Sequence, residues 1–106
     1  MKIKIINTTT DSEKIASHIA ESLVANNLSP CVQIISNIKS VYSWRDELIK
    51  SEEIMLIIKT IQEKVSNCKK LIQKLHNYDS PELIISDGEI LDDEYRDWFV
   101  QNCREI

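Results

Sequence analysis

The sequence predicts a single α+β domain over residues 1–106, with its elements in the order strand, helix, strand, strand, helix, strand, helix. Two apolar runs rich in β-branched residues flank an acidic middle between Pro30 and Thr60, and neither run has a helical period. Two other segments repeat apolar residues at intervals of three and four, as one face of a helix does. No linker, repeat or low-complexity segment divides the chain.

The first strand is expected from Lys2 to Asn7, and the polar run Thr8–Asp11 should end it. Thr10 followed by Glu13 has the spacing of a capping box, so a helix should begin there. Its end is expected at Asn26-Asn27, because asparagine tolerates the left-handed conformation of a C-terminal cap. The apolar stripe of this helix comprises Ile15, Ala16, Ile19, Ala20, Leu23 and Val24.

A long β-hairpin is expected next, with its first arm from Cys31 to Trp44. Ser36-Asn37 should bend or bulge this arm, after which Ile38, Ser40, Tyr42 and Trp44 would share a face. The turn is placed at Arg45–Glu47, and the return arm runs to Thr60.

The return arm is apolar on both faces, with Ile54, Leu56 and Ile58 on one side and Met55 and Ile57 on the other. An antiparallel sheet covered by helices on one face usually carries polar residues on the other. We therefore expect Met55 and Ile57 to form an exposed patch, together with Tyr42 or Trp44. A patch of that kind is typical of an interface and predicts self-association.

The second helix is expected over Glu63–Asn77, followed by the connector Tyr78–Pro81 and a short strand at Leu83–Ile85. A terminal helix should begin near Asp92, where acidic residues complement the helix dipole. This order is that of the split βαβ, or ferredoxin-like, fold with an extra C-terminal helix and a long central hairpin.

Composition excludes several classes of function. A net charge of −4 argues against nucleic acid as a partner. No apolar run approaches the roughly 18 residues of a membrane span, and Met1 leads directly into a strand-like segment, so we expect a cytosolic protein without a membrane partner. The three cysteines fit no metal or redox spacing and are expected to be reduced and mostly buried.

Catalytic motifs are lacking in the sequence, so no enzyme is expected. The densest group of donor atoms lies between His76 and Glu82. Here His76 and Asp79 could supply an imidazole and a carboxylate to a metal ion. Alternatively, His76 interacts with the C-terminal dipole of its helix. Two donors do not make a site, and a third would have to come from elsewhere in the fold or from a neighbouring chain.

Charged residues in the hairpin allow two interpretations. Glu47, Glu52 and Glu53 are expected to form a solvated tip that discourages edge-to-edge aggregation. Lys59 ends an apolar run and must reach solvent or find a partner. It either has a structural role or lines a cleft between subunits.

Five short motifs follow one another along nearly the whole chain. They are Cys31-Val32, Ser40-Val41-Tyr42-Ser43-Trp44, Leu56-Ile57-Ile58-Lys59-Thr60, His76-x-Tyr78-Asp79-x-Pro81-Glu82-Leu83 and Tyr95-x-x-Trp98. In order and spacing, this set resembles the CutA divalent-cation tolerance family. The resemblance implies a ferredoxin-like subunit assembled as a homotrimer, with long hairpins extending the sheets across subunits. It also implies binding of Cu(II) or another divalent cation, which is not expected to be required for folding.

The resemblance also implies site residues. His76 is the candidate metal ligand, and the cleft between subunits is expected to contain Tyr42, Trp44, Lys59, Tyr78 and Glu82. Three positions depart from the family pattern: Asp46 stands where glycine is common, Asn77 where proline is usual, and Asn7 where some members have cysteine. The loss of that cysteine removes a possible copper ligand.

Three functions remain open at this point. The leading hypothesis is a non-enzymatic homotrimer linked to metal tolerance that binds Cu(II) through His76. The first alternative resembles the trimeric nitrogen-regulatory signalling proteins, which bind small ligands in clefts between subunits. The second is a structural trimer that holds partners together.

Overall fold

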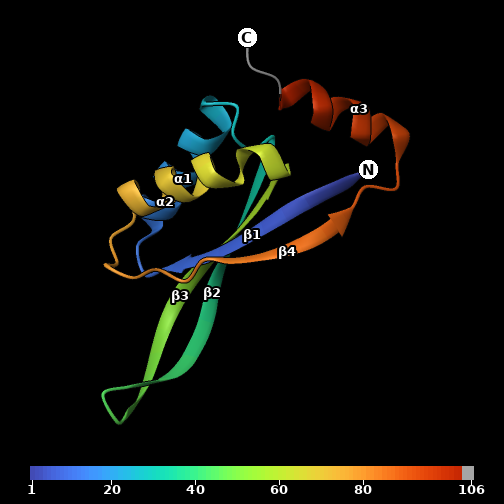
Figure 1. Ribbon diagram of the computed structural model, residues 1–106. Helices are drawn as coiled ribbons and strands as arrows, with labels where there is room; N and C mark the ends of the chain where they lie inside the picture. Colours follow the sequence, from blue (N-terminus) through green and yellow to red (C-terminus); the bar gives the residue numbers. More distant parts are fainter. Residues whose placement is uncertain (104–106) are drawn as a thin grey trace.

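The computed structural model describes residues 1–103 as an antiparallel sheet of four strands with three α-helices (Figure 1). The order of strands across the sheet is β2-β3-β1-β4, as in a ferredoxin-like fold. The elements are β1 (Lys2–Thr10), α1 (Glu13–Ala25), β2 (Cys31–Trp44), β3 (Glu47–Thr60), the short 3₁₀ helix η1 (Gln62–Lys64), α2 (Val65–Leu75), β4 (Ile84–Glu89) and α3 (Asp93–Asn102). The predicted fold class is thereby confirmed.

The main core lies between the sheet and one layer of two helices, α1 and α2 (Figure 1). The predicted stripe of α1, except Val24, which is exposed, meets the face of β3 that carries Ile54, Leu56 and Ile58. The helix α2 adds Cys68 and Ile72. On the other face, Phe99 of α3 packs with Ile3 and Cys103 in a smaller cluster. The helix α3 thus covers only part of the second face.

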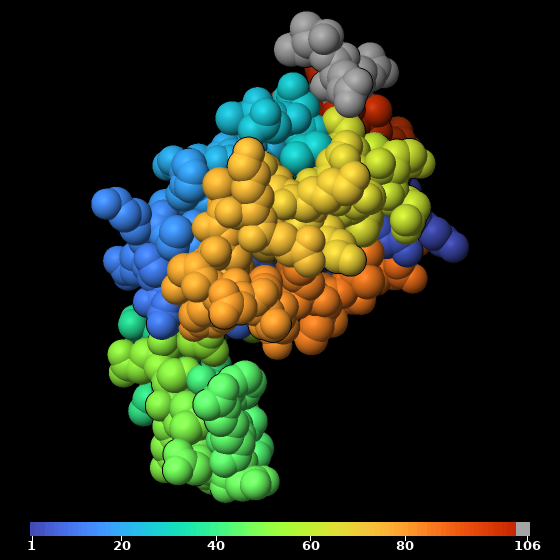
Figure 2. Space-filling model, turned by 60° about the vertical axis from the view of Figure 1, so that its left-hand side comes forward, coloured from blue at the N-terminus to red at the C-terminus, as the bar shows by residue number. Residues whose placement is uncertain are grey.

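The β2–β3 hairpin projects beyond the two helices as a separate arm (Figures 1 and 2). Ile35 pairs with Met55 and Ile38 with Glu53, so β2 carries one extra residue at the predicted bulge. Asn37 lies in this bulge with a φ of 62°, a conformation that asparagine tolerates. The bulge keeps Ile35 and Ile38 on one face although their spacing in the sequence is odd.

A two-residue turn closes the hairpin. Trp44 pairs with Glu47, and the φ angles of Arg45 and Asp46 are 51° and 62°. Positive φ at both central residues is the pattern of a type I′ turn, which matches the twist of the two strands. The chain therefore forms this type I′ turn with Asp46 in place of the glycine that is common at this position in the family.

Several predicted boundaries were wrong. β1 continues through the threonines to Thr10, because residues 8–10 pair with β3. The helix α1 is capped by Ser12 rather than Thr10, and the Ser12 hydroxyl accepts a hydrogen bond from the Ile15 N–H. β4 passes through Gly88, where a Cβ atom would lie 2.9 Å from Cδ1 of Ile5.

The second face of the sheet is more covered than expected at its centre and less covered along the hairpin. Met55 and Ile57 are half-buried, whereas Tyr42 and Trp44 are exposed as predicted. On this face Trp44 exposes 60% of its surface, and on the opposite face of the arm Val41 and Leu48 expose 61% and 70%. The arm thus exposes apolar side chains on both of its faces.

Candidate functional site

The candidate site forms where the connector between α2 and β4 folds beside the end of β1. β4 pairs with β1 only as far as Asn7, so the outer edge of β1 is free of strand pairing over Thr8–Thr10. The connector approaches this edge and begins with His76, the C-terminal cap of α2. Side chains of the connector can therefore bind the carbonyl groups and side chains at the end of β1.

His76 is held by both of its ring nitrogens. Nδ1 accepts a hydrogen bond from the Tyr78 backbone N–H at 3.0 Å, and Nε2 lies 2.9 Å from the Thr9 carbonyl oxygen. Because Nδ1 is an acceptor, the proton of a neutral ring must be on Nε2, which donates to Thr9. The imidazole therefore fastens the connector to β1.

Tyr78 extends from the same loop to the base of the hairpin. Its hydroxyl donates a 2.8 Å hydrogen bond to Oε2 of Glu53, and its ring centroid lies 4.9 Å from that of His76. Burial raises the pKa of the Tyr78 hydroxyl above its ordinary value, and the hydrogen bond to Glu53 and the nearby carboxylates of Glu53 and Asp11 raise it further. The tyrosine is a neutral donor, suited to holding an anion in place.

Glu53 was wrongly predicted to belong to a solvated tip. Glu53 is only 8% exposed, whereas Glu47 and Glu52 are exposed as expected. A buried carboxylate needs a donor, and Tyr78 supplies it from a segment 25 residues away. The alternation of β3 could place Glu53 on a face but could not reveal that the connector covers it.

Asn77 adds a second attachment of the connector. Its side-chain oxygen accepts a 2.6 Å hydrogen bond from the Thr10 hydroxyl, and its amide nitrogen donates to Asp11 at 2.7 Å. A proline, the usual family residue, has no side chain that could make these bonds. The departure at position 77 therefore adds contacts between the connector and β1. Sequence reasoning missed this role of Asn77 and Thr10.

Lys59 lies apart from this cluster. It is half-buried and lines an open cavity of about 460 Å³ with Gly88, Asp92 and Tyr95. It is six positions along β3 from Glu53, which corresponds to about 20 Å along a strand. Within one chain, the residues predicted for a common cleft thus fall into two groups.

The other predicted cleft residues are exposed. Tyr42 lies close enough to Tyr78 to contribute to its raised pKa, after the larger effects of burial and Glu53. Trp44 lies at the tip of the arm, where the Arg45 guanidinium is 5.6 Å from its ring centroid. Glu82 is exposed on the connector. Tyr42 is therefore near Tyr78, whereas Trp44 lies at the far end of the arm.

A metal ion would find an incomplete site in one chain. Over residues 1–103, no three side chains among His, Cys, Asp and Glu come together in a way that could hold a metal. Coordination by Nε2 of His76 would require the proton to move to Nδ1, which would break the hydrogen bonds to both Thr9 and Tyr78. Metal binding at His76 therefore stays a prediction, and it requires donors from outside this chain.

The cysteines are separate from the site and free of disulfides. Cys68 and Cys103 are buried and Cys31 is half-buried. Burial raises the pKa of both the Cys68 and the Cys103 thiols, so these two groups favour the neutral, unreactive form. In the described part of the chain, no helix is long and apolar enough to cross a membrane.

The βαββαβ order, the extra helix and the long hairpin define a ferredoxin-like protein with a projecting β-arm. The model of one family, described as CutA1 divalent ion tolerance protein, matches residues 4–102. This chain therefore belongs to the CutA1 divalent ion tolerance family, as its motifs suggested.

Individual relatives agree with this result. The divalent-cation tolerance protein CutA of Thermus thermophilus is 32% identical over 102 residues, which cover 93% of this chain and 96% of the relative. The protein CutA of Homo sapiens is 30% identical over 98 residues, but the chain spans only 55% of its length. For the Xenopus laevis homolog the match spans 50% of the relative. The chain thus spans about half the length of several curated relatives.

Solved structures show the same fold. The CutA1 crystal structure from Ehrlichia chaffeensis superposes with a TM-score of 0.90 at 34% identity and covers 97% of this chain and 96% of its own. The CutA1 crystal structure from Oryza sativa has a TM-score of 0.91 at 28% identity, and the match covers 99% of this chain and 95% of the Oryza sativa chain. The projecting arm and α3 are included in these coverages, so they belong to the common fold.

Proposed function

We propose that this chain acts as a non-catalytic homotrimer in the cytosol and contributes to divalent cation tolerance through a site between protomers. The observation that carries this proposal is the position of the His76–Tyr78–Glu53 cluster at the base of an apolar arm. Three free cysteines fit a reducing compartment.

The arm supports assembly for two reasons. β2 is an edge strand of 14 residues, and over residues 1–103 no further strand pairs with its outer edge. A long free edge with exposed apolar side chains is prone to pair with another chain. Copies of the same arm would cover Val41, Trp44 and Leu48 and bring a second chain close to Tyr78 and Glu53.

Cu(II) binding through His76 is the metal hypothesis. Imidazole nitrogen is a preferred copper ligand, and Glu53 offers a carboxylate nearby through its contact with Tyr78. Opening the two hydrogen bonds of the ring would cost about 1–3 kcal/mol in total. We therefore expect the affinity to be about one to two orders of magnitude below that of a free imidazole in the same ligand set.

Calorimetric titration with Cu(II) tests this hypothesis on wild type, His76→Ala and His18→Ala. The two histidines make a matched pair, because His18 is exposed on α1 and far from the cluster in sequence. The hypothesis predicts binding that is lost in His76→Ala and retained in His18→Ala. Equal binding by wild type and His76→Ala would exclude His76 as a ligand, and no binding by wild type would exclude the metal hypothesis.

A small polar ligand that donates hydrogen bonds is the second candidate, because the Tyr78 hydroxyl oxygen and the Glu53 carboxylate lie side by side and can both accept. A ligand that binds only the native state raises its melting temperature. A screen of cellular metabolites by thermal shift should therefore find stabilisation of wild type that Tyr78→Phe loses. If neither copper nor any metabolite stabilises the protein, a purely structural trimer becomes the better explanation.

A further inference from the structure

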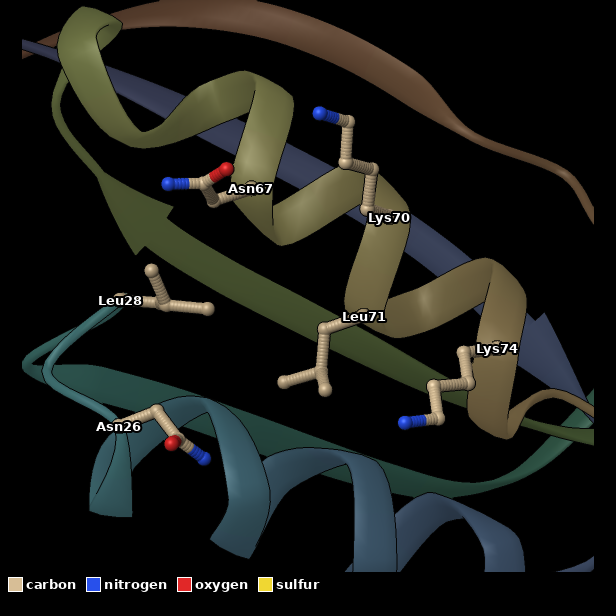
Figure 3. Close-up of a pocket in the computed structure, with 6 residues that line it drawn as sticks. All are labelled: Asn26, Leu28, Asn67, Lys70, Leu71 and Lys74. Atoms are coloured by element: carbon tan, nitrogen blue, oxygen red, sulfur yellow. The ribbon is translucent and has the colours of Figure 1, made fainter.

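An open groove lies between α1 and α2, on the surface of the helix layer that faces away from the sheet (Figure 3). Its volume is about 370 Å³, and Leu28 and Leu71 form an apolar floor. Around them stand Asn26, Asn67, Lys70 and Lys74; in Figure 3 the Lys74 side chain extends from α2 toward α1, and the Lys70 side chain extends from α2 away from α1. The groove thus combines an apolar centre with amide and ammonium groups at its rim.

The charge of this rim is opposite to that of the molecule. The chain has a net charge of −4, yet α2 carries Lys69, Lys70 and Lys74 and no acidic residue between Val65 and Leu75. The ion pairs within residues 1–103 involve Lys4 and Arg96, and none involves the three lysines of α2. Within residues 1–103, neither Lys70 nor Lys74 at the groove is therefore held in a salt bridge.

We propose that this groove binds an acidic peptide segment of a partner protein, with one apolar side chain of the segment seated between Leu28 and Leu71. Lys70 and Lys74 are one helical turn apart on α2. Two carboxylates one turn apart on a helical peptide have the same spacing and could face both lysines. The amides of Asn26 and Asn67 each offer donors and an acceptor, as a peptide backbone does. Apolar anchoring combined with opposite charge is a common mode of peptide recognition.

A small molecule fits this groove less well than a peptide. Sites for small molecules bury most of the surface of their ligand, whereas two leucines on an open face cover one side of an apolar group only. A peptide could use all three kinds of group in the groove: its carboxylates would meet the lysines, its backbone the asparagine amides, and one apolar side chain the two leucines. The proposal is independent of the cluster at His76, which lies at the end of β1.

The binding experiment uses a short fluorescein-labelled peptide in which glutamates flank a central leucine, measured by fluorescence anisotropy at low salt. We expect saturable binding to wild type and a Kd at least about tenfold weaker for the double variant Lys70→Glu with Lys74→Glu. The matched control, Lys2→Glu with Lys14→Glu, changes the net charge equally at exposed positions away from the groove. It should keep its Kd within about twofold of wild type.

Two altered probes separate the groove from general charge attraction. A peptide with glutamine in place of each glutamate, and one with serine in place of the leucine, should both bind more weakly to wild type. Equal melting temperatures of the variants would show that the fold is retained. The proposal would be overturned if wild type did not bind the peptide, if both double variants lost binding equally, if either altered peptide bound as well as the first, or if only vesicles of anionic lipid were bound.

Discussion

Tyr78 is the residue that joins the connector to the hairpin, through its hydrogen bond to the buried carboxylate of Glu53. Removal of the hydroxyl in Tyr78→Phe leaves Glu53 without the side-chain donor that it has in residues 1–103. An unsatisfied buried acceptor costs about 1–3 kcal/mol, so the free energy of unfolding should fall by about that amount in urea denaturation. Tyr42→Phe is the control, since its hydroxyl is on an exposed side chain. A loss as large in Tyr42→Phe would contradict this role of Tyr78.

The raised pKa of Tyr78 predicts a dependence of stability on pH. The folded state keeps the hydroxyl neutral, whereas in the unfolded state it ionises near its ordinary pKa of about 10. The contribution of Tyr78 is thus complete below about pH 10 and is lost as the pH rises further. Unfolding free energies measured across the alkaline range should fall more steeply in wild type than in Tyr78→Phe. Equal slopes would show that the hydroxyl has no such linkage.

Residues such as Glu53 show where prediction from sequence stops. The bulge at Ser36-Asn37 and the faces of β3 followed from the residue pattern, and the structure confirms them. The partner of Glu53 did not, because contact with Tyr78 depends on the path of the connector in space. His76 could be recognised from its residue type as a possible metal ligand. That both of its ring nitrogens are engaged in hydrogen bonds is a property of the folded chain.

At the scale of elements, the start of α1 depends on Ser12. Its hydroxyl accepts from the Ile15 N–H, one of the donors that a helix cannot satisfy by itself. Ser12→Ala should lower the free energy of unfolding by about 1 kcal/mol. Ser17→Ala, at an exposed position within the same helix, should be neutral or slightly stabilising. An equal effect of both substitutions in thermal unfolding would show that Ser12 does not act as the cap.

The hairpin turn contains two residues in the left-handed region, neither of them glycine. Asp46→Gly should stabilise the protein by about 0.5–1 kcal/mol, because relief of the left-handed penalty exceeds the entropic cost of glycine. Asp46→Ala should destabilise it, since alanine lacks a polar side chain that could support this conformation. Chemical denaturation of both variants gives the signs. A loss of stability in Asp46→Gly would contradict the strain inferred for this turn.

The types of the four strands and three α-helices could be predicted because their periodicities are strong, whereas η1 and several boundaries could not. Thr8–Thr10 look like a loop by composition, yet pairing with β3 keeps them in β1. Gly88 looks like a strand end, yet close packing against Ile5 makes glycine suitable within β4. In both cases a tertiary contact decides against the local preference.

For the whole molecule, the central claim is that the apolar arm is an assembly surface and that the candidate site is completed by another chain. The exposed apolar side chains of the arm and, over residues 1–103, the unpaired outer edge of β2 support this claim. Substitution of Val41 and Leu48 by aspartate would place charges on the exposed arm, and we expect it to weaken assembly while leaving the core of α1, α2 and β3 intact.

Multi-angle light scattering of the purified protein at micromolar concentration tests this claim most directly. We expect a mass three times that of one chain for wild type and a shift toward smaller species for the double aspartate variant. A wild-type protein with the mass of a single chain would contradict it.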